Sequence, residues 1–542
     1  MPLITIDGLG LDVTRTSSAD IIASSVKLLS SVYGSDDTAL TVKTGEGRYD
    51  YASKEIAGVG NQNNDSQNNS DITKAVFAID ASNLAKIQSG RVFLIATKQG
   101  VGVKMAAEIL ASSMVNIDAN GDVYYSTISA GEAANLKSSA KIQAVEGLDF
   151  NSSNFSNSSN AFSSSISAPN LTIQAQEFKN FGKVSAYNLT IQNSGALTNL
   201  GDIEALNLNL ANIANINNFG SIYGEDSLRI SGGDLTNARS SSYAGRGSSG
   251  SIFSPQDYSL ILTGLLINDG GLISSDGSLT VVANGLQNNS VAIANSINLK
   301  GEISAQNNLS FLIVGSAANS GNLIAGKDLN FTADSFSNFG VIQSGDDSAF
   351  NLASLVNAKN SSIYSAKNLS FNFNSPINLG GDNLNSLTNL GKISASQNLS
   401  ITGSAAIINS NKILAGGALS LAGKGLTNNS NAIIASLGSS LALIFTSDLQ
   451  NYGELNSKTN AIIAAANINN LGLIKSSAKA TITADTINNQ TDAQIVAGDD
   501  LAIGANLNLN NSGTIYSVGD LTASAVTLLI FQLKKVGFIW QQ

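Results

Sequence analysis

The sequence predicts an all-β chain wound into a right-handed parallel β-helix, a solenoid with about 19–21 residues per coil. The first observation is a template, Asn-x-Gly-x-(Ile/Val)-x-(Ala/Ser)-x-x-Leu-x-(Ile/Leu/Phe), which spans residues 180 to 191. The template returns after 19 residues within three sets, and single copies begin at two further asparagines: Asn180/Asn199/Asn218, Asn319/Asn338, Asn451/Asn470, and Asn389 and Asn511. A fixed period of this length is typical of repeat proteins, in which each repeat forms one structural unit.

The second observation is that apolar residues alternate inside each repeat. The alternating pairs are Leu171/Ile173, Leu189/Ile191, Leu206/Leu208 and Leu228/Ile230. Alternation over a few residues indicates strands, and the surrounding Asn, Gly, Ser and Asp favour tight turns. One repeat cannot bury its apolar face, whereas stacked repeats can place Leu on Leu and Ile on Ile. Parallel strands joined by crossovers are right-handed in nearly every known case, which gives the predicted handedness.

A second corner of the coil is predicted where three segments align: residues 325–331, 415–421 and 497–503. Their third and fourth positions vary freely among Lys, Gly, Asp and Ala. Free variation within one chain indicates solvent exposure and no fixed chemical task.

The segment from residue 1 to residue 60 lies outside the repeat but also predicts strands at positions 9–13 and 21–29, and a strand followed by a turn over positions 41–45 and 48–51. Residues 61 to 70 contain only Asn, Gln, Asp and Ser and predict a polar loop.

Residues 75 to 103 are the most distinctive segment outside the repeat. They contain Phe77-Ala-Ile-Asp80, a run from Arg91 that ends at Thr97, and Gly100-Val-Gly-Val103. Together with Thr44-Gly45 and Asp50-Tyr51, this segment resembles the amino-terminal secretion domain of filamentous haemagglutinin-like exoproteins. The likeness spans about residues 8 to 130, and the later repeats are similar to the haemagglutinin repeats of the same family.

The resemblance implies three regions. Residues 1–130 would be a partial two-partner-secretion (haemagglutination activity) domain, itself β-helical, and residues 131–525 would be haemagglutinin-type β-helix repeats. Residues 526–542 leave the template and predict a non-repeat tail. The resemblance also implies an outer-membrane two-partner-secretion transporter as a partner and a place outside the cell or on the bacterial surface. No signal peptide is visible after Met1, so we expect a chain that begins partway through its secretion domain and leave open whether it is exported.

Two Ser- and Asn-rich stretches interrupt the apolar alternation. Residues 151–165 predict a loosely ordered coil or a loop, and residues 239–250 predict a protruding loop.

Composition narrows the class of function. The chain has 542 residues, 13% of them charged, a net charge of −10, no Cys and no His. Because no basic surface is visible, nucleic acid is not expected as a partner. Without Cys and His there is no disulfide framework, no thiolate metal site and no imidazole for proton transfer, so we expect no cofactor and no metal site.

Paired aspartates are the sequence motifs that could most plainly support metal binding or catalysis. Asp36-Asp37, Asp346-Asp347 and Asp499-Asp500 could bind calcium or hydrolyse polysaccharide, but neighbours on a strand face opposite ways, so structural corners are the favoured interpretation. The segment 118–122 faintly resembles a calcium loop, and a hairpin turn at Asn120-Gly121 is favoured. The fragment Gly380-Gly381-Asp382 stands alone and does not make a calcium nonapeptide repeat.

Two repeated positions have a binding alternative. Asn180, Asn199 and Asn218 are interpreted as a stacked ladder that holds a corner, against a row that binds sugar. Similarly, Phe181, Phe219 and Phe339 are interpreted as rings stacked at the coil edge, against a surface stripe for binding.

We therefore expect no catalytic, cofactor or metal residues. The resemblance implies a secreted or cell-surface filamentous adhesin rod, non-catalytic, which attaches to host cells or other surfaces through a surface protein or glycan and contributes to virulence. Two alternatives stay open: the stalk of a contact-dependent inhibition or haemolysin-type exoprotein, and a β-helix enzyme that degrades polysaccharide. Sugar release by the purified protein would favour the enzyme.

Overall fold

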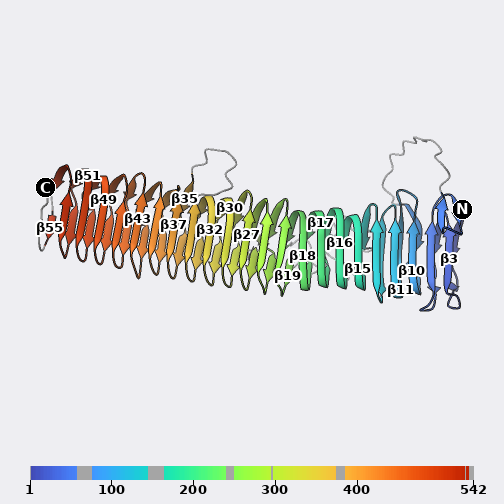
Figure 1. Cartoon of the computed structure of the whole chain (residues 1–542). Coiled ribbons are helices and arrows are strands. Elements are labelled where there is room, and N and C mark those ends of the chain that lie inside the picture. Colours follow the sequence, from blue (N-terminus) through green and yellow to red (C-terminus); the bar gives the residue numbers. More distant parts are fainter. Residues whose placement is uncertain are drawn as a thin grey trace, which may run out of the picture. The chain divides into compact units, whose positions relative to one another are not determined.

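The computed structural model describes residues 2–57, 76–144, 164–239, 250–293, 297–373, 385–530 and 533–535. These residues form strands and turns, with no helix among them, and they stack as a β-solenoid of about 23 turns. The predicted fold class is confirmed, while the right-handed winding stays a prediction. The chain divides into two compact units, Met1–Ile273 with Ile293–Ile297, and Ser274–Ala292 with Asn298–Gln542. Figure 1 shows the strands of each unit following one another in chain order.

The strands that begin before residue 275 have the following bounds: β1 (Leu3–Ile6), β2 (Leu11–Asp12), β3 (Ser18–Ala23), β4 (Ser25–Leu28), β5 (Val32–Tyr33), β6 (Ala39–Thr44), β7 (Arg48–Asp50), β8 (Glu55–Ala57), β9 (Val76–Ala81), β10 (Lys86–Ala96), β11 (Val101–Ala119), β12 (Val123–Ala130), β13 (Ala133–Ser138), β14 (Lys141–Ala144), β15 (Ser165–Asn180), β16 (Lys183–Asn199), β17 (Asp202–Asn218), β18 (Ser221–Ala238), β19 (Ser251–Ser254), β20 (Tyr258–Leu262), β21 (Leu265–Asp269) and β22 (Leu272–Ser275).

The strands that begin after residue 275 have the following bounds: β23 (Leu279–Ala283), β24 (Gly285–Ile293), β25 (Ile297–Lys300), β26 (Glu302–Ala305), β27 (Leu309–Ile313), β28 (Ser316–Asn319), β29 (Asn322–Ala325), β30 (Leu329–Asn338), β31 (Val341–Ser344), β32 (Ser348–Asn357), β33 (Ser362–Ser365), β34 (Leu369–Phe373), β35 (Ser386–Asn389), β36 (Lys392–Ala395), β37 (Leu399–Gly403), β38 (Ala406–Asn409), β39 (Lys412–Ala415), β40 (Leu419–Gly423), β41 (Gly425–Asn428), β42 (Ile433–Ser436), β43 (Leu441–Phe445), β44 (Leu449–Asn451), β45 (Glu454–Ser457), β46 (Ala461–Ala464), β47 (Asn467–Asn470), β48 (Leu473–Ser476), β49 (Ala480–Asn489), β50 (Gln494–Ala497), β51 (Leu501–Asn511), β52 (Thr514–Ser517), β53 (Leu521–Ser524), β54 (Thr527–Ile530) and β55 (Leu533–Lys535).

Strands pair in parallel with the strand one coil later. β16 pairs with β17 over nearly its whole length, and Val184 lies beside Ile203 while Asn199 lies beside Asn218. Among the described strands, β7 and β8 form a separate antiparallel hairpin, so Arg48–Asp50 is a strand and the expected turn follows at residues 51–54. The strands expected before position 60 are present as β2, β3, β4 and β6, and the segment 76–103 forms β9, β10 and the start of β11.

The interior of the first unit is a stack of aliphatic side chains. Leu189 lies beside Leu208 in the next coil, and Leu208 lies beside Leu228. Each of these three residues is at most 4% exposed. The predicted pair Leu206/Leu208 is therefore wrong: Leu206 is 37% exposed, and Leu210 is the second buried residue of that coil. Both pairs satisfy the alternation, and only the register between coils distinguishes them.

The interior of the second unit contains a column of phenylalanines that was not predicted from the sequence. Phe331 has its ring centroid 4.3 Å from that of Phe336 and 5.0 Å from that of Phe311. The column continues from Phe350 to Phe371 with a centroid separation of 4.9 Å. Parallel stacking of like side chains is the way in which repeated coils build a core.

Several expectations fall on residues that lie outside the described part of the chain: the polar loop at 61–70, nearly all of the stretch 151–165, the loop at 240–249, the fragment 380–382 and the chain after residue 535. The described part of the expected tail differs from the expectation. Thr527–Ile530 forms β54, which pairs in parallel with β51, and Leu533–Lys535 forms β55, which pairs with β52. The hydrogen bonds between parallel strands join backbone groups and do not depend on the side chains of the template. The coil can therefore continue past the last copy of the template.

Candidate functional site

Buried asparagines hold one corner of successive coils in the first unit. The ladder consists of Asn180, Asn199, Asn218, Asn237 and Asn268, and all five are 0% exposed. Each of the first four donates from Nδ2 to Oδ1 of the next asparagine at 2.8 Å. The same Nδ2 of Asn199 also donates to the backbone carbonyl of Ser221 at 2.9 Å. The predicted ladder is confirmed, and the sugar-binding row is excluded because these amides do not meet solvent.

The second unit has a longer ladder of the same kind. Its members are Asn288, Asn319, Asn338, Asn357, Asn389, Asn409, Asn428, Asn451, Asn470, Asn489 and Asn511, and each is at most 1% exposed. Successive side chains are linked by Nδ2 to Oδ1 hydrogen bonds of 2.7–2.9 Å.

The template missed some ladder members because they lack glycine two residues later: Asn237, Asn288, Asn357, Asn409, Asn428 and Asn489. An apolar residue two positions before each asparagine, as in Leu235-Thr-Asn237, is the signal that would have found them.

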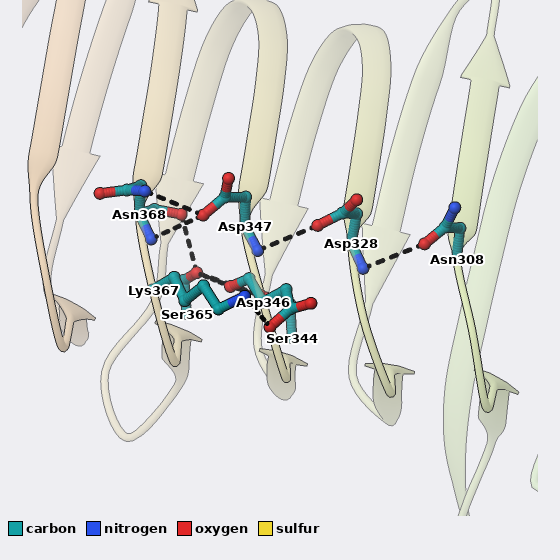
Figure 2. A network of polar contacts seen from close by, with 8 residues as sticks. All are labelled: Asn308, Asp328, Ser344, Asp346, Asp347, Ser365, Lys367 and Asn368. Carbon is teal, nitrogen blue, oxygen red and sulfur yellow. Dashed lines mark hydrogen bonds and ion pairs between the residues drawn. The ribbon is translucent and has the colours of Figure 1, made fainter.

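The second predicted corner is held by exposed side chains, which Figure 2 shows for four successive coils. The backbone N–H of Asp328 donates to Oδ1 of Asn308 at 3.3 Å, and that of Asp347 donates to Oδ1 of Asp328 at 3.1 Å. Asn368 then donates both its backbone N–H and its Nδ2 to Oδ1 of Asp347, each at 3.0 Å. Asp and Asn are interchangeable here because either offers the oxygen that the next backbone N–H needs. This confirms the structural interpretation of Asp347.

Asp346, the other member of that pair, has a different structural partner. Its carboxylate lies 2.7 Å from Nζ of Lys367, and this hydrogen bond raises the pKa of Lys367. The backbone carbonyl of Asp346 accepts hydrogen bonds from the hydroxyls of Ser344 and Ser365 (Figure 2). The two carboxylates therefore act on separate neighbours and do not converge on one point.

In Asp499-Asp500, a single member, Asp500, makes both kinds of contact. Asp500 accepts the backbone N–H of Asp520 at 2.9 Å and lies 2.9 Å from Nζ of Lys479. The hydrogen bond from Lys479, followed by that from the Asp520 backbone, lowers the pKa of Asp500. The remaining pair, Asp36-Asp37, lies in the turn between β5 and β6.

The hairpin expected at Asn120-Gly121 is wrong. β11, which ends just before it, and β12, which begins just after it, pair in parallel, so the segment is a corner between coils. A type I′ turn requires positive φ at both central residues, and neither has it. Instead Nδ2 of Asn120 donates to the carbonyl of Thr97 at 2.7 Å. Asp118 lies 3.6 Å from Nζ of Lys137.

The three phenylalanines of the Asn-Phe-Gly motif do not share one environment. Phe181 is 7% exposed, Phe219 is partly exposed and Phe339 is 58% exposed. Because their exposed fractions differ, a common binding stripe does not describe all three, while the edge stack stays a prediction. The stacked phenylalanines of the second unit lie in the core instead.

A shallow groove on the first unit is a candidate for contact with a ligand. It has a volume of about 350 Å³ and crosses β15, β16 and β17. Its lining residues are Ser167, Ala168, Pro169, Ser185, Ala186, Tyr187 and Glu204. Ser167, Ser185 and Glu204 lie side by side on the three strands, and Tyr187 is 65% exposed at the edge. None of these residues was predicted from the sequence, because the groove arises from neighbours that belong to different coils.

The surroundings of the groove are polar and aromatic. Lys183 forms an ion pair with Glu204. Beyond Glu204, the same row continues to Tyr223 and Phe253, whose rings stack with centroids 5.8 Å apart.

An exposed amide ladder runs beside the groove. Asn188 donates to Asn170 at 2.8 Å, Asn207 donates to Asn188 at 3.0 Å, and the hydroxyl of Ser227 donates to Asn207 at 2.8 Å. An exposed ring with hydroxyls, amides and one paired carboxylate suits a neutral polyhydroxylated ligand, since the ring offers an apolar face and the polar groups offer hydrogen bonds.

Within the described ranges no group of three acidic residues is placed to hold a metal ion. The same part of the chain contains no helix that could cross a membrane. No protein-family model, curated protein or solved structure matches the chain.

Proposed function

We propose that the chain is a non-catalytic adhesin of the filamentous haemagglutinin type, secreted or held at the bacterial surface. The observation that carries the proposal is that repeated coils, held by internal asparagine ladders, present a groove with the exposed ring of Tyr187. The resemblance of residues 75 to 103 to the secretion domain of that family supports the same conclusion. It also suggests an outer-membrane two-partner-secretion transporter as the export partner.

The contacts of the acidic residues favour a non-catalytic role over glycoside hydrolysis. Asp347 and Asp500 accept backbone N–H groups of the next coil, and Asp346 pairs with Lys367. Glycoside hydrolysis by the usual mechanism requires two carboxylates facing one bond. The groove lining supplies one, Glu204, and Lys183 neutralises it.

The test is attachment of the purified full chain to host cells and to an array of neutral glycans. We expect binding that saturates, and we expect Tyr187→Ala to weaken glycan binding about tenfold or more, because stacking on an aromatic ring is lost. Tyr452→Ala is the matched control, since Tyr452 is 41% exposed and lies far from the groove in sequence.

Two results would overturn the proposal. One is the absence of attachment to every cell type and glycan tested. The other is release of reducing or unsaturated sugars from polysaccharide, abolished by Glu204→Gln, which would indicate the degrading enzyme.

A further inference from the structure

One face of the second unit carries no charge over eleven consecutive coils. We define the uncharged face as the second and fourth residues of β23, β27, β30, β32, β34, β37, β40, β43, β46, β49 and β51, which point away from the core. These strands are paired in parallel from each one to the next. Every residue at these positions is Ser, Thr, Asn, Gly, Ala, Val, Leu or Ile.

Low overall charge does not explain this face. In the same unit, the strands that follow the asparagine ladder project Lys392, Lys412, Glu454 and Lys475 toward solvent. Charged residues also border the uncharged face at both corners: the Lys367–Asp346 and Lys479–Asp500 pairs on one side, and Lys424, Asp448 and Asp485 on the other. A charge-free centre inside a charged rim is the anatomy of a protein interface.

The uncharged face also carries apolar side chains whose burial against a partner would be favourable. Leu312, Ile444 and Ile462 protrude from it with 47%, 51% and 53% of their surfaces exposed. Some of its hydroxyls are already bonded to the preceding coil: Thr402 donates to the carbonyl of Phe371 at 3.4 Å and Ser370 to that of Ser348 at 3.3 Å. Covering the face therefore removes no ion from water.

From these observations we infer that the uncharged face binds the same face of a second copy of this chain. Eleven strands at about 4.8 Å spacing give a length of about 48 Å, and five residues per strand give a width of about 16 Å. The resulting area of about 770 Å² per copy matches the roughly 800 Å² per partner of a stable standard interface. A second copy has the same strand spacing, so side chains that protrude from one sheet meet the gaps of the other along the whole length. An unrelated globular partner would not share that period.

The test uses the full chain and measures mass by sedimentation equilibrium across the micromolar range. The expected result is a dimer of twice 55.7 kDa that persists at high salt, because no ion pair forms its centre. In a two-fold arrangement with the copies running in opposite directions, the middle strand β37 faces its own counterpart. Thr402→Lys, on β37, then places two cations against each other and should weaken association at least a hundredfold.

The matched control is Thr388→Lys, on β35 of the same coil, which lies outside the uncharged face and should leave the dimer intact. Because a lysine could disturb folding, circular dichroism of each variant accompanies the measurement, and Thr402→Lys is mixed with Thr402→Glu, which should restore a heterodimer. A chain that is monomeric at every concentration, a dimer that Thr402→Lys does not weaken, or equal loss in both lysine variants would overturn the inference. This test does not depend on adhesion, so either proposal can fail alone.

Discussion

At the scale of single residues, asparagine forms ladders both in the buried interior and on the exposed surface, and its position decides how much each ladder stabilises the coil. Asn218 is fully buried, receives a hydrogen bond from Asn199 and donates one to Asn237. Asn207, on the same strand, makes similar bonds to Asn188 and Ser227 on the surface. The two sets of hydrogen bonds have similar geometry. Water can take the place of the lost bonds at the exposed Asn207, but it cannot reach the buried Asn218.

Replacing Asn218 by Ala should therefore destabilise the coil strongly. Nδ2 of Asn199 and Oδ1 of Asn237 would lose partners while staying buried, which costs about 2–4 kcal/mol. The measurement is the opening free energy of β16 to β18 from hydrogen exchange. Asn207→Ala is the control and should change that free energy by less than about 0.5 kcal/mol, because water replaces the lost bonds. Equal effects of the two substitutions would contradict the role of burial.

At the scale of one corner, the glycine of the Asn-x-Gly motif is required by the close approach of successive coils. A Cβ on Gly201 would lie 2.0 Å from the carbonyl oxygen of Gly182, and one on Gly220 would lie 2.0 Å from that of Gly201. These glycines have ordinary negative φ, so space and not backbone conformation excludes a side chain. The glycine of the motif is therefore needed wherever successive coils approach each other too closely to leave space for a Cβ.

Gly201→Ala should push two coils apart and cost at least about 1–3 kcal/mol. The control is Gly504→Ala, because the nearest atom to its added Cβ is 3.7 Å away. That substitution should be neutral or should stabilise by about 0.4–1 kcal/mol, since it restricts the unfolded chain. Urea denaturation of the two variants and the parent chain gives the comparison, and a tolerated Gly201→Ala would show that the coils can separate freely.

The charged corner should respond to acid. Lys479 and the Asp520 backbone lower the pKa of Asp500, so its contribution to stability is present above the ordinary Asp pKa of about 4 and is lost as pH falls through the lower folded value. The amide of Asp520, corrected for intrinsic exchange, should lose protection in that acid range.

Two controls accompany this prediction. In Asp500→Asn the acceptor oxygen stays but does not titrate, so the loss with pH should disappear. The neighbouring corner provides an internal control, because the backbone N–H of Lys479 donates to the amide oxygen of Asn460 at 3.3 Å. Equal loss of protection at both amides would assign the effect to general acid unfolding.

At the scale of the whole molecule, each unit is a sum of similar coils that contact only their neighbours. Stability in such a stack is local, so coils can open one after another. We expect urea unfolding of the full chain to be broad, with a slope in denaturant well below that of a single cooperative domain of 542 residues. Calorimetry checks the same point, and a single sharp transition with equal calorimetric and van't Hoff enthalpies would contradict it.

The sequence was sufficient for the coil but not for its register. The regular return of Asn180 at Asn199 and Asn218 predicts stacked coils and an asparagine ladder at a corner, and both are present. Leu206 was placed in the core because Leu206-Asn-Leu208 alternates as well as Leu208-Asn-Leu210 does. The hairpin at Asn120 was likewise a local pattern, which the parallel pairing of β11 and β12 overrides.

The groove beside Tyr187 and the uncharged face centred on β37 could not be predicted in the same way. Each collects residues from different coils, and the spacing along the chain between partners on neighbouring strands is not constant. Ser167 lies beside Ser185, whereas Ser370 lies beside Ser400, because some coils carry longer connections than others.

By itself, the sequence determined that this chain coils, because alternation and a fixed period leave a lone repeat unable to bury its apolar side. The tertiary structure alone decided which leucine of a pair enters the core, which surface residues become neighbours, and where the coil continues past the template. The physical reason is that side-chain alternation is a local property, whereas register and surface neighbourhoods depend on backbone hydrogen bonds between residues distant in the chain.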